Sequence, residues 1–316
     1  MELDKFKFKR ILIPLIIAVF VSFPLLCKSQ YFLHIAILCL LWSVVASAWN
    51  LIMGYAGITS FGQLAFFTIG AYTVGLLNKY LGVSPWIGMF FSGIFPAIIG
   101  LLVGLICLRL RGIYILLITL GMQEIVPVFI LWQTKYTGGS VGFSDMPVLS
   151  IGSYSYGTNA LPYYYTAFAF ALLFCFLIYK VINSSIGLAF VALRDSENFA
   201  KALGINDYKY KILVFAISAF ITGFMGALYG LYIRFATPSL CGWEYVIILL
   251  IAIFLGGEGR FPGEIIGTFF IITANELLQG TSELRDAALG ITVLLVVFLM
   301  PNGLVALISR SKEGKP

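Results

Sequence analysis

The chain has 316 residues, of which 60% are hydrophobic and only 11% are charged. A soluble domain is closer to half apolar and a quarter charged, so a soluble globule of this size is excluded. The net charge of +6 needs no nucleic acid to explain it, because lysine and arginine gather in short segments between apolar runs, as in cytoplasmic loops.

A mean hydropathy of +1.00 and repeated long apolar runs predict an all-α polytopic membrane protein. The runs lack the strict alternation of a β-barrel. Ten such runs predict about ten transmembrane helices, at 11–27, 32–53, 62–81, 86–108, 113–133, 161–181, 211–233, 244–256, 264–280 and 287–308.

Two of these runs, 11–27 and 244–256, differ from the others. The basic stretch MELDKFKFKR precedes the first run, and no A-x-A site follows that run, so we expect an uncleaved helix rather than a signal peptide. The run 244–256 is short for a crossing, which leaves a short or re-entrant helix open.

The lysines and arginines of the loops predict the orientation of the chain. If every run crosses, the basic residues near the N-terminus, at 109–111, at 180–211 and after 308 fall on one side. By the positive-inside rule that side is cytoplasmic. We therefore expect a single membrane domain over 1–316 with both termini inside, an inner loop at about 182–210 and an outer loop at about 134–160.

The inner loop contains a short amphipathic helix that Ser196 caps and Gly204 ends. Its apolar and charged faces favour the docking of a partner. An interfacial helix lying on lipid is the alternative, although Asp195 and Glu197 suit an anionic membrane surface poorly.

Motifs of enzymes and metal sites are missing from the sequence. There is no G-x-x-x-x-G-K-[ST] phosphate loop, no HExxH, no GxSxG and no paired Cys/His cluster. We therefore expect no catalytic residues, no metal and no cofactor.

A few polar residues interrupt the apolar runs, where they are costly unless they face the bundle interior or a cavity. Pro127 frees a backbone carbonyl one turn back, near Gln123. Hydrogen bonding between helices is the alternative role. The candidates for a substrate path in these runs are Asn50, Gln123, Glu124, Asn275 and Glu276.

The segment GYAGITSFGQ (54–63) places three glycines between two apolar runs. Glycine permits unusual backbone angles and close approach, and Thr59 and Ser60 can satisfy unwound backbone. No lysine or arginine occurs between Leu51 and Asn78, unlike an ordinary inner turn. The segment predicts a helix break that lines the path, with close helix packing as the alternative. Its path candidates are Gly54, Tyr55, Gly57, Ser60, Gly62 and Gln63.

A second glycine cluster, LGGEGRFPGEIIG (255–267), loosely echoes the first. Two such clusters in the two halves of a chain suggest a weak internal repeat with a site between the halves. A charged inner turn is the alternative.

Several segments resemble one known family. WNLIMGYAGITSFGQLAFFTIGAY (49–72), RLRGIYILLITLGMQEI (109–125), TGGSVGFSDMP (137–147), the stretch 187–229, FLGGEGRFPGEIIG (254–267) and MPNGL (300–304) are similar, in order, to the permease subunits of ABC importers for branched-chain amino acids, of the LivM/LivH type. The resemblance covers most of 40–305.

The resemblance implies a non-catalytic permease of the bacterial cytoplasmic membrane. Its implied partners are a homologous second permease, two cytoplasmic ABC ATPases and a periplasmic or lipoprotein substrate-binding protein. The family's coupling loop maps onto Leu193, Arg194, Glu197, Ala200, Ala202, Leu203 and Gly204, although Asn198 and Phe199 depart from the E-A-A-x-x-x-G pattern.

Two other functions stay open at this point. The first is a permease of the same family for urea or short amides. The second is a stand-alone secondary transporter driven by an ion gradient, with Glu124 and Glu276 as carriers.

Overall fold

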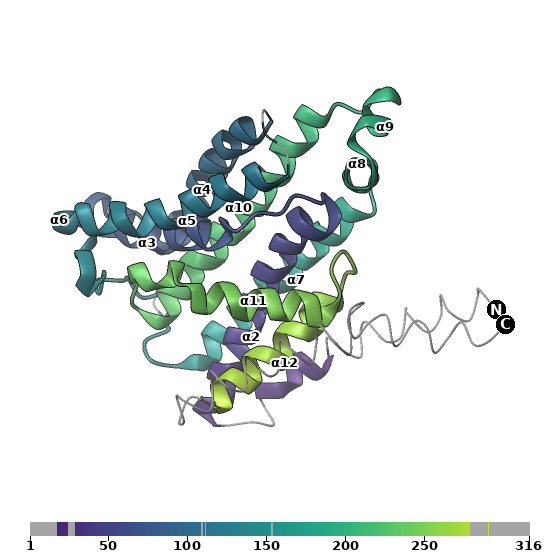
Figure 1. Ribbon diagram of the computed structural model, residues 1–316. Helices are drawn as coiled ribbons and strands as arrows, with labels where there is room; N and C mark the ends of the chain where they lie inside the picture. The colour runs from purple at the N-terminus through teal and green to yellow at the C-terminus, as the bar shows by residue number, and fades with distance from the viewer. Residues whose placement is uncertain are drawn as a thin grey trace.

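The structure is a computed structural model that describes residues 18–24, 29–108, 110, 112–152, 154–278 and 290. Each apolar run predicted between 32 and 280 coincides with a helix (Figure 1). The runs 11–27 and 287–308 lie mostly outside the described residues. The helices are α2 (Gln30–Asn50), η1 (Leu51–Tyr55), α3 (Gln63–Leu81), α4 (Pro85–Cys107), α5 (Ile113–Trp132), α6 (Thr134–Thr137), η2 (Gly139–Val141), α7 (Ala160–Ile182), α8 (Ser185–Asp195), α9 (Glu197–Ala202), α10 (Asp207–Ile233), η3 (Pro238–Cys241), α11 (Trp243–Gly256) and α12 (Gly263–Leu277).

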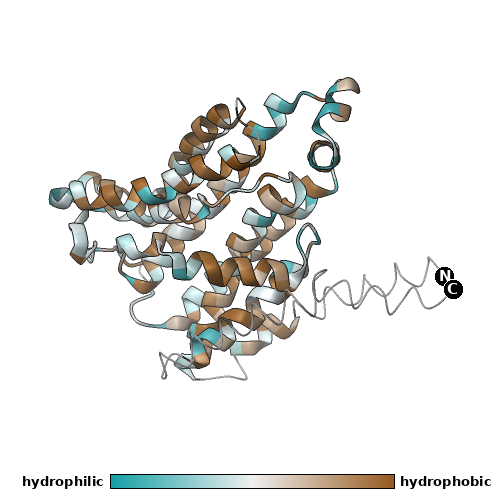
Figure 2. Cartoon of the chain, in the orientation of Figure 1, coloured by the Kyte–Doolittle hydropathy of each residue, from teal (hydrophilic) through white to brown (hydrophobic). Residues whose placement is uncertain are grey.

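Five of the described helical segments are long and apolar enough to cross a membrane: Gln30–Tyr55, Pro85–Cys107, Ile113–Trp132, Ala160–Ile182 and Asp207–Ile233. Hydrophobic residues predominate along these helices, whereas hydrophilic residues are frequent in α8 and α9 (Figure 2). A polytopic helical protein is thus confirmed. The count of ten crossings and the internal repeat stay predictions.

The expectation of an entirely helical chain misses one small feature of the predicted outer loop. Strand β1 (Ser150–Ile151) pairs antiparallel with β2 (Tyr154–Ser155). Gly152 lies between them with a positive φ of 59°, which a tight hairpin turn requires.

Helix α10 packs against α2, α3 and α4 and forms the centre of the bundle. It runs antiparallel to α2, because His34 Nδ1 lies 2.7 Å from the Tyr232 hydroxyl, while Ser218 donates to the carbonyl of Ala48 at 2.6 Å. Glycine lets the backbones of α3 and α10 touch, since a Cβ on Gly70 would overlap the main chain of α10.

The crossing after α2 is broken, as the sequence predicted. Helix α2 continues through the π-helix η1 to Tyr55, and α3 does not begin until Gln63. Gln63 Nε2 donates to Ser218 Oγ at 2.9 Å, and the backbone N–H of Ala65 donates to Gln123 Oε1 at 3.0 Å. Ser218 and Gln123 lie near the middle of α10 and α5, so α3 begins about half-way through the bundle.

Helix α11 begins at the same level. Gln123 Nε2 donates to the carbonyl of Cys241 at 2.6 Å, and Trp243 Nε1 donates to Glu124 Oε1 at 3.1 Å. The 14 residues of α11 rise about 21 Å, short of the ~30 Å hydrocarbon core. Helix α11 is therefore too short to cross the hydrocarbon core along its own axis. The first turns of α3 and α11 meet in mid-bundle.

Candidate functional site

The two glycine clusters of the sequence meet beyond the C-terminal end of α2. Asn50 is fully buried, and its Oδ1 accepts a hydrogen bond from the backbone N–H of Gly259 at 2.9 Å. The Tyr55 hydroxyl accepts one from the backbone N–H of Phe261 at 2.8 Å. The loop between α11 and α12 is thus held against the end of the α2–η1 helix. We call this contact region the glycine junction.

Arg194, at the end of α8, joins the glycine junction. Its Nη1 donates to the carbonyl of Gly54 at 2.8 Å. Gly57 and Gly259 both have φ of +66°, where side chains are disfavoured. A Cβ on Gly57 would also overlap the aliphatic part of the Arg194 side chain, and one on Gly259 would crowd its Nη1. The glycines therefore make the space in which Arg194 lies.

Ion pairs hold α9 beside the start of α10. Glu197 pairs with Lys201 at 2.8 Å and with Lys211 at 3.0 Å, and Lys201 pairs with Asp207 at 2.8 Å. Burial alone would raise the pKa of Glu197, but the hydrogen bonds from Lys201 and Lys211 outweigh burial and leave the pKa lowered. Two of these ion pairs therefore join α9 to the start of α10.

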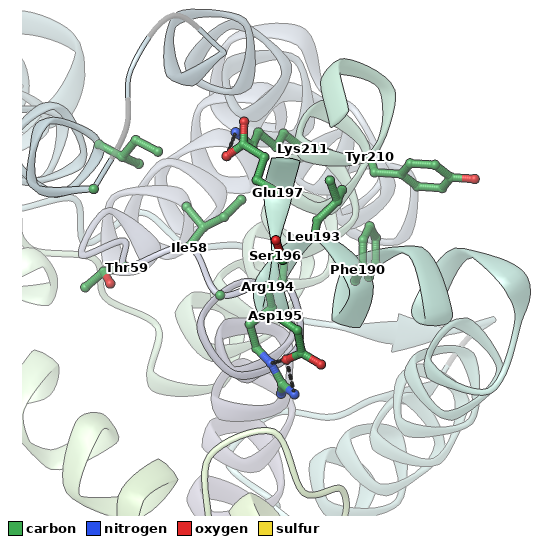
Figure 3. A pocket seen from close by; sticks show the side chains of 14 residues that line it. Ile58, Thr59, Phe190, Leu193, Arg194, Asp195, Ser196, Glu197, Tyr210 and Lys211 are labelled. Carbon is green, nitrogen blue, oxygen red and sulfur yellow. Dashed lines mark hydrogen bonds and ion pairs between the residues drawn. The ribbon is translucent and has the colours of Figure 1, made fainter. Parts of the chain in front are cut away.

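A cavity of about 290 Å³ opens between this segment and the helix break. Residues 56–59 of the break form one wall, and Arg194, Glu197 and Lys211 contribute to the other (Figure 3). The salt bridge of Arg194 with Asp195, at 3.0 Å, is at the edge of this cavity. The break and the predicted coupling loop thus share one surface.

The predicted coupling residues divide by exposure. Leu193 and Ala200 are buried and hold the segment to the bundle, whereas Ala202, Leu203 and Gly204 are exposed. Phe199 is 65% exposed. Phe199 is a large apolar residue on the outer side of the short helix α9, and this feature would have added it to the predicted coupling residues.

Residues 60–62, at the end of the break, contact neighbouring helices. Trp49 Nε1 donates to the carbonyl of Ser60 at 2.7 Å, and the backbone N–H of Phe61 donates to Thr119 Oγ1 at 3.1 Å. A Cβ on Gly62 would crowd the carbonyl of Thr119 at 3.2 Å. These contacts satisfy backbone groups that leave the helical hydrogen-bond pattern.

Comparison with known proteins adds to this geometry. The family described as "Branched-chain amino acid transport system / permease component" matches residues 31–300. The chain belongs to this family. It is 29% identical over 299 residues to the high-affinity branched-chain amino acid transport system permease protein LivM of Escherichia coli (strain K12), covering 88% of this chain and 70% of that protein.

Two further relatives are also branched-chain amino acid transport permeases. A probable LivM of Methanocaldococcus jannaschii is 26% identical, with 84% of this chain and 90% of the relative covered. The LivH permease of Escherichia coli (strain K12) is 29% identical over 124 residues, 39% of this chain and 40% of LivH. No solved structure matches the chain.

In this branched-chain amino acid permease, the remaining path candidates lie apart from the glycine junction. Helix α12 rises about 18 Å between Glu264 and Glu276 at 1.5 Å per residue. Glu264 is at the junction end, whereas the backbone carbonyl of Glu276 accepts from the Tyr31 hydroxyl at 3.1 Å. Asn275 and Glu276 are therefore not brought together with Asn50.

Glu264 is a buried residue of the permease that the path candidates omitted. Its side chain is fully buried, and both carboxyl oxygens lack a hydrogen-bond partner among the described residues. The side chains of Ser47 and Asn50 lie close to the carboxyl without forming hydrogen bonds of good geometry with it. The second glycine cluster, which contains Glu264, was the available signal.

Among the described residues, no group of three or more His, Cys, Asp and Glu side chains could hold a metal ion.

Proposed function

We propose that this chain is the permease subunit of an ABC importer that carries branched-chain amino acids across the bacterial cytoplasmic membrane. The observation that carries the proposal is the family match over residues 31–300. Its proposed partners are a homologous second permease, two cytoplasmic ABC ATPases and a periplasmic or lipoprotein substrate-binding protein. Similarity to both LivM and LivH proteins supports pairing with a second, different permease.

The segment α8–α9 is the proposed docking surface for an ATPase, on the cytoplasmic side together with both termini. Phe199 and Leu203 are 65% and 66% exposed, and ion pairs join the same segment to α10. Exposed apolar side chains on a fixed polar segment are typical of a protein interface. Arg194 would pass movement of this surface to the carbonyl of Gly54.

The substrate path is proposed to follow the break between η1 and α3. Its members Asn50, Gly54, Tyr55 and Gly57 belong to the glycine junction, and Ser60, Gly62, Gln63 and Gln123 line the mid-bundle meeting of α3 and α11. Broken helices in mid-membrane supply backbone groups to polar substrates, and helix N-termini suit a carboxylate. An amino-acid zwitterion has that chemistry.

Docking is tested by placing glutamate at Ala202, an exposed position of α9. We expect Ala202→Glu to reduce co-purification of the ATPases and ATP-driven leucine uptake together. The same substitution at exposed Tyr208 on α10 is the control, with both properties kept. Survival of both in Ala202→Glu refutes the docking surface.

The alternatives are separated in liposomes. We expect leucine uptake only when all partners and ATP are present, and competition by isoleucine and valine but not by urea or acetamide. Uptake by the purified chain alone under a proton or sodium gradient would instead identify a secondary transporter.

A further inference from the structure

One face of α5 is unlike the other exposed surfaces of the bundle. Helix α5 is the least buried of the five long apolar helices, with 22% of its most apolar window buried against 94% for Gln30–Tyr55. Leu117, Gly121, Glu124 and Val128 recur on one face at helical spacing. Leu117 and Val128 are 55% and 63% exposed, and open space lies beside Gly121. With Trp243 of α11, 48% exposed, they form what we call the Glu124 face.

Glu124 lies at the level where the middle of the bilayer is expected. It follows Gln123, which joins the first turns of α3 and α11, and it accepts a hydrogen bond from Trp243 in an exposed setting. A carboxylate exposed to hydrocarbon at this depth is costly, and such residues face protein or a water-filled cavity.

The exposed faces of α4 and α7 provide the contrast. On α4 the exposed large side chains are apolar, including Phe95 and Leu102, and on α7 they include Leu173 and Phe176. Lipid tails can cover such surfaces without cost. Lipid does not suit the Glu124 face.

The position of the face excludes the other partners. ATPases and a substrate-binding protein work outside the hydrocarbon core, so neither can cover a mid-membrane carboxylate. The occupant must itself be embedded in the membrane.

We propose that the Glu124 face packs against the second permease subunit, which supplies hydrogen-bond donors to Glu124 at mid-membrane depth. This inference rests on the proposed function. Gly121 admits close approach of a partner helix, as small residues do at membrane helix interfaces. Because α3 and α11 begin beside this face, the substrate path then opens toward the boundary between the two permeases.

The test is photo-crosslinking in the complete transporter in native membranes. Benzoylphenylalanine replaces Val128 on the face, or Leu102 on α4 as the control; the two side chains are 63% and 55% exposed. We expect an adduct with the second permease from position 128 and none from position 102. No permease adduct from 128, an adduct with another copy of this chain, or an equal adduct from 102 each overturns the assignment.

A second test, by co-purification, does not depend on the placement of the crosslinking probe. Gly121→Leu should reduce co-purification of the second permease at least tenfold, while Leu102→Trp should leave it unchanged. Unchanged co-purification in Gly121→Leu overturns the proposal. ATP-driven leucine uptake by the wild-type membranes is measured in parallel: uptake with a failed crosslink rejects only this face, whereas uptake without ATP rejects the proposed function.

Discussion

Arg194 joins α8 to the helix break by a hydrogen bond to the carbonyl of Gly54. This hydrogen bond joins Arg194 to a residue that lies 140 positions away in the sequence. Glycine at positions 57 and 259 leaves room for the Arg194 side chain, so the contact depends on missing side chains as much as on the arginine. This explains why a glycine cluster occurs where an ordinary inner turn would carry lysine or arginine.

Loss of this contact should uncouple the transporter rather than dismantle it. A hydrogen bond from a charged group contributes about 1.5–3 kcal/mol. We expect Arg194→Ala to lower leucine uptake per ATP hydrolysed by roughly tenfold to a hundredfold, with the ATPases still bound. Asp195→Asn is the matched control, since its exposed salt bridge with Arg194 contributes little. Equal loss in both variants would show that the contact with Gly54 is irrelevant.

At Glu264, in contrast to Arg194, we expect a neutral substitute to be tolerated. Because the carboxyl is fully buried beside Ser47 and Asn50, a neutral amide of the same shape should replace it. We expect Glu264→Gln to keep the thermal stability and uptake of the wild type, and Glu264→Lys to abolish accumulation in the membrane. Thermal unfolding of the purified complex measures both. Loss of uptake in a well-folded Glu264→Gln variant would assign the carboxylate a role in transport.

At the scale of elements, α9 is held by charges and therefore responds to pH. The folded-state pKa of Glu197 is lowered. Its stabilising contribution is therefore complete above the ordinary glutamate pKa and is lost as pH falls through the lowered value. We expect backbone amides of α9 to exchange hydrogen faster, relative to α10, as pH falls through that range. After correction for intrinsic exchange rates, an unchanged ratio would contradict the ion-pair account, as would normal protection in Lys211→Met.

The amide of Gln123 links the first turn of α3 to the start of α11, beside hydrogen bonds from Cys241 Sγ to the carbonyl of Leu64 and to Thr68 Oγ1. Gln123 accepts from Ala65 and donates to Cys241, and each buried backbone group left unpaired costs about 1–3 kcal/mol. Gln123→Leu should therefore lower the free energy of unfolding by about 2–6 kcal/mol. Met122→Leu, one position away, should change it by less than about 1.5 kcal/mol. A smaller loss in Gln123→Leu would mean that water replaces the amide.

Helices and their limits follow from the sequence because each is a continuous apolar run with local end signals. Ser196 caps α9 through the N–H of Phe199, and Gly204 ends that segment with φ of 84°, as expected. The break at 54–63 follows from glycine content for the same local reason. The sequence does not predict which of these runs lie side by side, because pairing depends on contacts between distant segments.

The path candidates illustrate that limit. Asn50 and Glu276 looked equivalent as polar residues in apolar runs, yet the antiparallel packing of α2 and α12 puts them at different levels. The contact of Arg194 with Gly54 was likewise invisible, since both residues were candidates for separate roles. The burial of Leu193 and Ala200 shows that two of the seven predicted coupling residues pack into the bundle instead.

At the scale of the whole molecule, helices α3 and α11 start in mid-bundle, and the glycine junction closes one end of the break. One element, α8–α9, is in contact with that junction and exposes apolar side chains. Such a chain can convert movement at its surface into movement of a break, but it contains no nucleotide-binding motif of its own. The proposed function assigns the energy of transport to the ATPase partners.

Leucine uptake and ATP hydrolysis, recorded side by side in proteoliposomes, test this most directly. The liposomes contain this chain with its second permease, ATPases and binding protein, or this chain alone. The account predicts uptake that requires ATP and all partners, and strongly reduced uptake in Gly57→Ala, whose new methyl group would displace Arg194. Leucine uptake by the chain alone, driven by an ion gradient without ATP, would contradict it.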